Sequence, residues 1–199
     1  MGQIELKQSD ITIRRPVEDD TEELHAFFRL VLEEAFEANG ITSDAGIGIE
    51  EELQEKKKSL AEDLASSGRD RCYLLAEAEG RIVGTIASGP PGKMMLRLTE
   101  NSVKDLPELS TGFTHPYFRN QGIATRLLHA MLRRLQGDGV REACFDSGYP
   151  IAQSIWRSIF GNPDYLIRDF WGKEGHHMIW RIHVEQALRF LEERLMAKK

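Results

Sequence analysis

Apolar and polar residues follow one another along the chain with two different periods. Apolar residues three and four positions apart predict helices, whereas one-by-one alternation and short apolar runs predict strands. Clusters of Gly, Asn, Asp and Pro separate these segments and mark turns. The helical period covers five segments: 21–38, 49–66, 123–136, 151–160 and 185–198. The strand pattern covers seven shorter ones: 11–13, 72–78, 81–88, 108–115, 142–147, 164–171 and 176–184.

The turn signals between strands predict how the sheet is connected. Glu79-Gly80 indicates a tight β-hairpin, and Gly172 to Gly175 indicates a second one near the C-terminus. Hairpins join antiparallel strands, whereas the helix 123–136 allows one parallel crossover. The predicted fold class is therefore α/β (α+β), a mixed, mostly antiparallel central sheet with helices on both faces. Residues 93–106 follow neither period.

Length and composition indicate one globular domain, residues 1–199. The chain is 41% hydrophobic and 29% charged, and no apolar run approaches the roughly 18 residues of a membrane-spanning helix. The N-terminus lacks the basic and apolar regions of a secretory signal. Cys72 and Cys144 lie in strand segments, which favours buried free thiols over a disulfide. We therefore expect a cytoplasmic protein without a membrane partner.

The charge of the chain is unevenly distributed. The formal net charge of −6 argues against a general nucleic-acid binder. Residues 1–67 carry 7 Lys/Arg against 17 Asp/Glu, a balance of −10, whereas residues 68–199 have a balance of +4. An anionic ligand would therefore bind more favourably in the C-terminal two-thirds.

The stretch 119–125, RNQGIAT, places small residues at the first turn of a predicted helix. The first N–H groups of a helix lack internal partners and lie at the positive end of its dipole. Gly122 and Ala124 leave room for a phosphate to approach that backbone, with Arg119 just ahead of them. The alternative is an ordinary strand-to-helix turn in which Gly122 only relieves a steric clash. The stretch fits neither the Walker loop nor the dinucleotide-binding fingerprint.

This stretch resembles the pyrophosphate-binding motif of the GNAT N-acetyltransferases, Arg/Gln-x-x-Gly-x-Gly/Ala, read here from Arg119 to Ala124. The predicted order of elements is also similar to that family over about residues 10–184, with the helix 185–198 added. The segment AQSIWRSIFG, followed by YLIRDFW, resembles the helix and strand that complete the family's cofactor cleft. The resemblance implies acetyl-CoA as cosubstrate and a strand splay at the cofactor cleft.

The resemblance also implies which residues bind the cofactor. The strand 108–115 would pair through its backbone with the pantetheine arm and part from the strand 142–147. Phe113 and Thr114 would supply groups that polarise the thioester carbonyl. For His115, a structural role before Pro116 stands beside a catalytic one. The expected cofactor-binding residues are Phe113, Thr114, His115, Arg119, Asn120, Gln121, Gly122, Ile123, Ala124, Thr125 and Ser154.

Acetyl transfer to an amine needs a group that accepts a proton. An alkyl ammonium has a pKa of about 10.4 and must be deprotonated before it attacks. We expect Glu108 to be this base, because it begins the strand that would splay and some family members place their base there. The alternative is a solvated glutamate at a strand start, with Glu100 and Glu77 as reserve candidates.

The proton donor for the departing thiolate is harder to identify. Many family members use a tyrosine in the pattern Leu-Tyr-x-x-x-Gly-Phe, but this chain has Trp156 in that position, which cannot donate such a proton. Tyr149, just ahead of the helix, is the nearest substitute, and a packing role is its alternative. Ser154 and Tyr165 follow it.

These expectations leave three functions open. The first is an N-acetyltransferase acting on an amine of a small molecule or peptide, with the acidic loop 40–50 beside a cationic acceptor. The second is a CoA-binding or sensing module with weak catalysis. In the third, the helix 185–198 is the seam of a homodimer. We assign no metal, since the adjacent His176 and His177 on a strand point to opposite faces.

Overall fold

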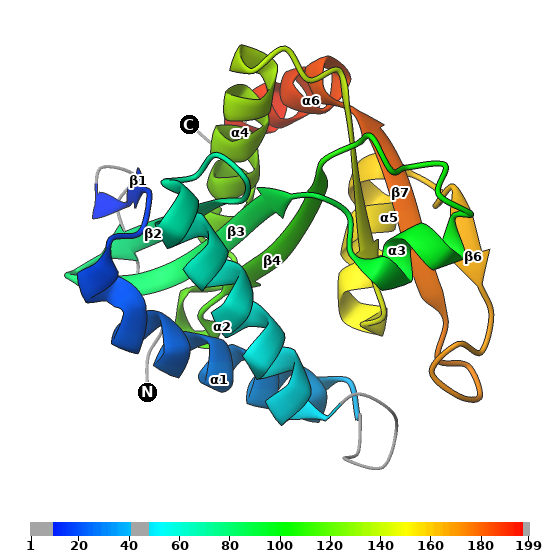
Figure 1. Cartoon of the computed structure of the whole chain (residues 1–199), viewed down its shortest axis with the longest axis horizontal. Coiled ribbons are helices and arrows are strands. Elements are labelled where there is room, and N and C mark those ends of the chain that lie inside the picture. The colour runs from blue at the N-terminus through cyan, green and yellow to red at the C-terminus, as the bar shows by residue number, and fades with distance from the viewer. Residues whose placement is uncertain (1–9, 41–47, 197–199) are drawn as a thin grey trace.

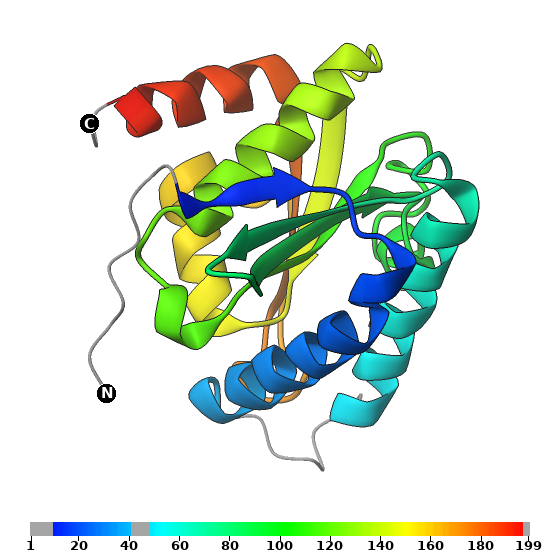
Figure 2. The same ribbon diagram turned by 90° about the vertical axis from the view of Figure 1, so that its left-hand side faces the viewer.

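The computed structural model describes residues 10–40 and 48–196, which form one seven-stranded sheet between two layers of helices (Figures 1 and 2). The strand order is β1-β2-β3-β4-β5-β7-β6, and every neighbouring pair is antiparallel except β4 and β5. The predicted mixed sheet with one parallel crossover is therefore confirmed. The strands are β1 (Thr12–Arg14), β2 (Cys72–Ala78), β3 (Arg81–Gly89), β4 (Glu108–Thr114), β5 (Glu142–Ser147), β6 (Tyr165–Ile167) and β7 (His177–His183).

Helices cover both faces of this sheet. On one face α1 and α2 pack over β2 and β3, and α3 packs over β5 and β7. On the other face α4, α5 and α6 share one apolar core with the sheet. None of the described helices is long and apolar enough to cross a bilayer. The helices are α1 (Thr21–Ala38), α2 (Ile49–Ser66), α3 (Lys93–Leu98), α4 (Ile123–Gly137), α5 (Pro150–Phe160) and α6 (Val184–Met196).

Two segments differ from the sequence prediction. The ambiguous stretch 93–106 contains the short helix α3. The predicted strand 164–171 was too long, because only Tyr165–Ile167 pairs with β7. The chain then turns at Asp169, whose φ is 52°, and brings the aromatic ring of Trp171 back against His177. Phe170 and Trp171 therefore pack against His177 at a turn and do not belong to a strand.

The C-terminal helix covers the chain's own core. The apolar face of α6, formed by Val184, Ala187, Leu188 and Leu191, is buried in the cluster that also contains the inner face of α4. An amphipathic helix used in this way needs no second copy of the chain to bury its apolar face. The homodimer stays a prediction.

The strands β4 and β5 separate as the sequence resemblance implied. Among the described residues, Glu108 and Cys144 are the one ladder pair between them, and the N–H of Cys144 donates to the carbonyl of Pro107 at 3.0 Å. Beyond this point the two ribbons diverge (Figure 1). A bulge in β4 accompanies the separation, because its pairing with β3 shifts by one residue near Thr111, whose φ is 51°.

A buried ion pair anchors α2 to the sheet. The carboxylate of Asp63 is fully buried, accepts a hydrogen bond from the N–H of Tyr73 at 2.8 Å, and contacts a guanidinium nitrogen of Arg15 at 2.7 Å. Burial of a charge is costly unless such partners surround it. This anchor therefore fixes the end of α2 relative to β2.

We expect Asp63→Ala to lower the free energy of unfolding by about 3 kcal/mol, because it leaves the Tyr73 N–H and the Arg15 guanidinium without their partner. Urea denaturation measures the loss. Arg189→Ala is the control, since its pair with Glu185 lies on the surface of α6 and should contribute less than about 0.5 kcal/mol. Equal losses in the two variants would contradict the anchor.

Candidate functional site

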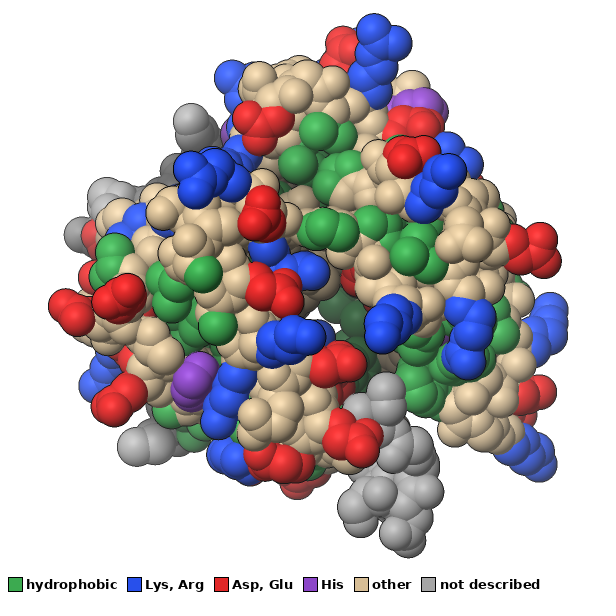
Figure 3. Space-filling view, viewed as in Figure 1, with side chains coloured by type: hydrophobic (Ala, Val, Ile, Leu, Met, Phe, Trp, Pro, Cys, Tyr) green, Lys and Arg blue, Asp and Glu red, His purple; other side chains and the backbone are tan. Residues whose placement is uncertain are grey.

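The separation of β4 and β5 creates a cleft that is open on the face covered by α2 and α3. The space-filling view shows the surface hollowed between these two helices (Figure 3). One side of the cleft is built from β4 and α2, and the other from β5 and the segment that follows it. Side chains from several elements can therefore meet ligands bound in one place.

The loop before α4 has the backbone of an anion cradle. Asn120 and Gly122 have φ angles of 64° and 78°, and the first helical hydrogen bond runs from the N–H of Arg126 to the carbonyl of Gly122 at 3.0 Å. The three amides 123–125 precede that bond, so they have no carbonyl one turn earlier within the helix. A Cβ built on Gly122 meets no atom within 4 Å. This open, positively polarised space fits a phosphate group.

The side chains of this loop have different surroundings. Ile123 is buried in the core and can offer a ligand only its backbone, whereas Ala124 is exposed. The guanidinium of Arg119 makes two hydrogen bonds to the carboxylate of Glu34 on α1, with its Nη1 2.6 Å from Oε1. No local sequence pattern predicts this pair, because Glu34 lies 85 positions before Arg119. A phosphate near Arg119 would compete with Glu34 for the same donors.

The outer part of β4 has one bonded edge and one edge towards the cleft. Phe113 and Thr114 pair with Thr85 and Gly84 of β3. Towards β5, this part of the strand has no ladder partner within the described residues. A strand edge of this kind offers N–H and C=O groups to an extended ligand.

His115 has a structural partner at the end of β4. Its Nδ1 accepts the N–H of Tyr117 at 3.3 Å and so caps the turn Pro116–Phe118. Burial lowers the pKa of His115, and the charges of Arg81 and Arg119 act in the same direction. A neutral ring in this position agrees with the structural alternative.

Glu108 lies at the point where the two strands part. Its Oε2 accepts the N–H of Gly92 at 2.6 Å, and its side chain is partly buried. Burial and then the negative charge of Asp146 raise the pKa of the Glu108 carboxyl to about 7, against the Gly92 hydrogen bond and the charges of Lys56 and Arg71. Near neutral pH this carboxyl can therefore both accept and release a proton.

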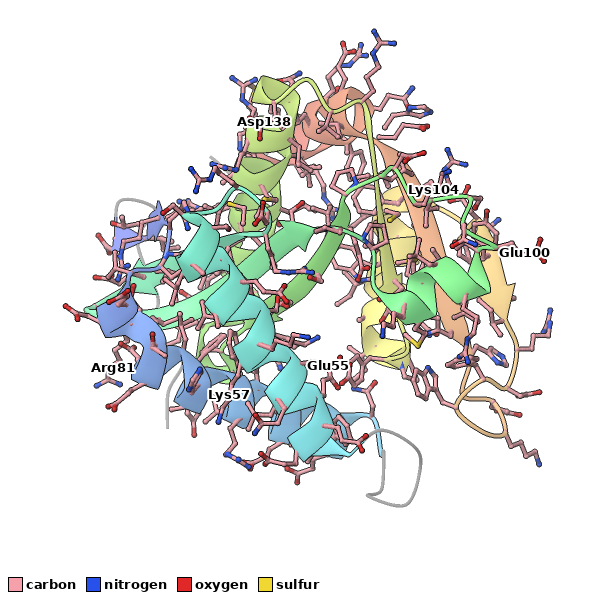
Figure 4. The ribbon with its side chains drawn as sticks, viewed as in Figure 1. Glu55, Lys57, Arg81, Glu100, Lys104 and Asp138 are labelled. Atoms are coloured by element: carbon pink, nitrogen blue, oxygen red, sulfur yellow. The ribbon has the colours of Figure 1, made fainter. Side chains whose placement is uncertain are left out.

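The two reserve candidates lie away from the cleft. Glu77 contacts Arg14 at 2.8 Å near the opposite edge of the sheet. Glu100 lies in an exposed turn after α3 and points away from the molecule (Figure 4). On α2, by contrast, Glu55 lies on the side that borders the opening (Figure 4).

Tyr149 reaches across the cleft to α2. Its hydroxyl donates to Oε2 of Glu52 at 2.8 Å, and its ring packs against Phe36 with 6.2 Å between centroids. Burial, followed by the charge and hydrogen bond of Glu52, raises the pKa of the Tyr149 phenol above its ordinary value. The phenol is therefore protonated at neutral pH, with its proton directed at Glu52.

The other candidate donors have different positions. Ser154 is exposed on α5, and Tyr165 shares a hydrogen bond with Ser102 at 2.7 Å near the β6 edge. Trp156 packs on Phe145 in the core, with ring centroids 5.0 Å apart. The structure therefore brings Glu108 and Tyr149 to the cleft face on which α2 lies. Tyr165 lies on the same face of the sheet but near the β6 edge, and Trp156 packs against the core on the opposite face.

One group in the cleft was not predicted. Asp146 on β5 contacts His177 of β7 at 3.1 Å, and His177 in turn accepts the indole N–H of Trp171 at 3.2 Å. A charged residue directly after the apolar run Ala143 to Phe145 was the available signal. His176 has separate partners, Asp169 among them.

Two further expectations concern metals and the acceptor loop. Within residues 10–40 and 48–196, no three His, Cys, Asp or Glu side chains gather closely enough to hold a metal ion. The acidic loop 40–50, expected beside the acceptor, falls largely at residues 41–47, outside the described residues.

Several solved structures share this fold. PaiA N-acetyltransferase from Thermoplasma acidophilum, in complex with coenzyme A, is 18% identical, with a TM-score of 0.61 over 86% of this chain and 99% of its own. Ribosomal-protein-alanine N-acetyltransferase from Brucella melitensis is 20% identical, with a TM-score of 0.59 over 86% and 99%. YncA from Salmonella typhimurium, a putative acetyltransferase with its cofactor acetyl-CoA, is 15% identical, with a TM-score of 0.62 over 88% and 94%.

Sequence comparison agrees with this likeness of folds. No curated protein sequence matches the chain. The model of the acetyltransferase (GNAT) family matches residues 26–161, from α1 to the end of α5. This match covers both sides of the cleft and the glycine loop before α4, so the chain belongs to the acetyltransferase (GNAT) family.

Proposed function

We propose that the protein transfers an acetyl group from acetyl-CoA to an amine of a small molecule or peptide, by direct attack in a ternary complex. The observation that carries the proposal is Glu108, a carboxyl with a pKa of about 7 at the point where β4 and β5 part. Structural relatives with coenzyme A or acetyl-CoA support the choice of donor.

The glycine loop and the edge of β4 fit the donor. The amides of residues 122–125 would hold the pyrophosphate, with Asn120 and Gln121 completing the cradle and Arg119 exchanging Glu34 for phosphate. The cleft edge of β4 at Phe113 and Thr114 would pair with the pantetheine arm. Ser154, exposed on α5, would contact the same arm from the other side.

The reaction removes two protons from the acceptor ammonium and delivers one to the thiolate. The carboxylate of Glu108 takes the first proton, and the neutral nitrogen attacks the thioester carbonyl carbon. The new C–N bond forms as the C–S bond breaks, and backbone N–H groups at Phe113 and Thr114 stabilise the charge on the carbonyl oxygen. Tyr149 donates a proton to the thiolate, and its phenolate takes the second proton from the nitrogen as the amide forms. Glu108 then releases its proton to solvent.

A CoA-binding module with weak catalysis is the second candidate. It is favoured by Trp156, which occupies the position where many relatives have a tyrosine and which packs in the core. The hydroxyl of Tyr149 also has an acceptor already, in Glu52. The absence of turnover with any amine, together with tight acetyl-CoA binding, would favour this second function.

We expect acetyl-CoA, but not ATP or NAD, to raise the thermal midpoint of the wild-type protein. At ~100 times its dissociation constant a ligand stabilises a fold by about 2.7 kcal/mol. Gly122→Val should abolish this shift, because its side chain would enter the open space of the cradle. Gly139→Val is the matched control, since Gly139 also has a φ of 78° and open space but lies beyond the other end of α4. Loss of the shift in both variants would contradict the assignment.

We expect Glu108→Gln to reduce kcat/KM by about 10²–10⁴-fold at neutral pH, because it removes the proton acceptor. In the wild type, kcat/KM should rise with pH through about 7, as the Glu108 carboxyl ionises, and the variant should lack this limb. Glu100→Gln, which lies outside the cleft, is the control. If kcat/KM of Glu108→Gln still rises with pH through about 7 as in the wild type, the base is another residue.

We expect Tyr149→Phe to lower kcat by roughly tenfold. This is less than a typical acid contributes, since a thiol with a pKa near 8.5 leaves readily as its thiolate. Glu52→Gln separates the two roles of the hydroxyl, because it removes the charge that Tyr149 contacts but leaves the phenol in place. If both variants lose activity equally, Tyr149 acts by linking α2 to β5 and not as the proton donor.

A further inference from the structure

A chain of hydrogen bonds runs from the turn between β6 and β7 into the cleft. The indole N–H of Trp171 donates to Nδ1 of His177 at 3.2 Å, and Nε2 of His177 lies 3.1 Å from Oδ2 of Asp146. His177 is 2% exposed, whereas the side chain of Asp146 is 24% exposed. This series of hydrogen bonds therefore begins among packed side chains and ends at the Asp146 carboxyl, which borders the cleft.

The indole determines which nitrogen of His177 carries the proton. An indole N–H can only donate, so Nδ1 must be the acceptor. In the neutral ring the proton then lies on Nε2, which donates to Asp146. A hydrogen bond to the charged form of a carboxylate stabilises that form.

Close packing fixes the position of Trp171. A Cβ on Gly148 would lie 2.6 Å from the indole nitrogen, so only glycine leaves room for the ring. The backbone N–H of Trp171 donates to the carbonyl of Gly175 at 2.8 Å, and this hydrogen bond closes the turn. Nε2 of Gln153 donates to the carbonyls of Ser147 and His176, each at 2.8 Å, and thereby ties the end of β5 to the start of β7.

The sheet register brings Asp146 to the side of Glu108. Glu108 and Cys144 are partners in the parallel pair, and Asp146 lies two residues after Cys144, so all three side chains point to one face. Burial, then the charges of Glu108 and Asp146, raises the pKa of Cys144 to about 12, so its thiol is neutral. Two carboxyl groups thus flank one uncharged thiol.

We infer that the Trp171–His177–Asp146 chain is a positioning device for Glu108, because it holds a fixed carboxylate beside the proposed base. The inference rests on the proposed function for the role of Glu108 in proton transfer. A negative charge close to a carboxyl favours the neutral form of that carboxyl. The contact with Nε2 of His177 holds the Asp146 side chain in place, and the charge of Asp146 raises the pKa of Glu108. Lys56 and Arg71 are the cations that act on Glu108 from α2 and from the start of β2.

The direct test is a titration of the Glu108 carboxyl in the full chain by carbon-13 NMR, assigned with Glu108→Gln. In the wild type its midpoint should lie near pH 7. Asp146→Asn keeps the shape but removes the charge, and should lower the midpoint by about one pH unit or more. His177→Phe removes the donor and should also lower the midpoint, because the Asp146 side chain is then no longer held beside Glu108. His177→Gln, which keeps a donor towards Asp146, should restore the wild-type value.

The controls separate this inference from the proposed function. His129→Phe changes a histidine that contacts Glu192 between α4 and α6, and should leave the Glu108 midpoint unchanged. An unchanged midpoint in folded Asp146→Asn would overturn the inference, and so would identical midpoints in His177→Gln and His177→Phe. The acidic limb of kcat/KM should follow the NMR midpoint in each variant. If the NMR midpoint falls while the limb stays in place, the positioning device stands and Glu108 is not the base.

Discussion

The single ladder pair between β4 and β5 is the constraint on which the site depends. A continuous sheet would satisfy the N–H and C=O groups along both strands, whereas here the pairing ends at Glu108 and Cys144. The bulge at Thr111 is itself stabilised, since the carbonyl of that residue accepts a hydrogen bond from the hydroxyl of Thr85 on β3 at 2.9 Å. The polar backbone edge that remains is a binding surface for a ligand with its own amide groups.

Contacts from α1 and α2 keep the separated strands at a defined distance. Tyr149, after β5, donates to Glu52 of α2, and the N–H of Ile151 in the first turn of α5 donates to the side chain of Asn39 at 3.2 Å. The cleft therefore has a ladder pair at one end and side-chain contacts at the other. Arg119 and Glu34 add a third contact, between α1 and the glycine loop.

The sequence predicted those parts of the fold and site that depend on local order. Helical and alternating patterns predicted the helices and strands, and Gly122 was predicted to precede the amphipathic helix that begins at Ile123. The anion cradle at this helix start stays a prediction. Contacts between distant segments carry no such local signal. Glu34 and Arg119 are separated by 85 positions, and Glu52 and Tyr149 by 97.

The same limit explains the one strand prediction that was wrong. The aromatic residues Phe170 and Trp171 suit a strand, but in the structure their rings pack around His177. A pattern of residue types records that a side chain is buried, but not which partner buries it. The role of Trp171 follows only once β5, β6 and β7 are placed together.

Glu108, the proposed base, illustrates how opposed forces in a cleft can set the pKa of a carboxyl. Burial and the charge of Asp146 favour its neutral form, while the Gly92 N–H, Lys56 and Arg71 favour the carboxylate, and the outcome is a pKa of about 7. Each of these influences strengthens as water leaves the cleft, because the local dielectric falls. Ligands that displace water therefore change this balance, and in the proposed reaction an arriving ammonium group would add a cation that favours the carboxylate. A carboxyl held at this balance would then take the proton of the proposed acceptor in the complex and return it to solvent after the products leave.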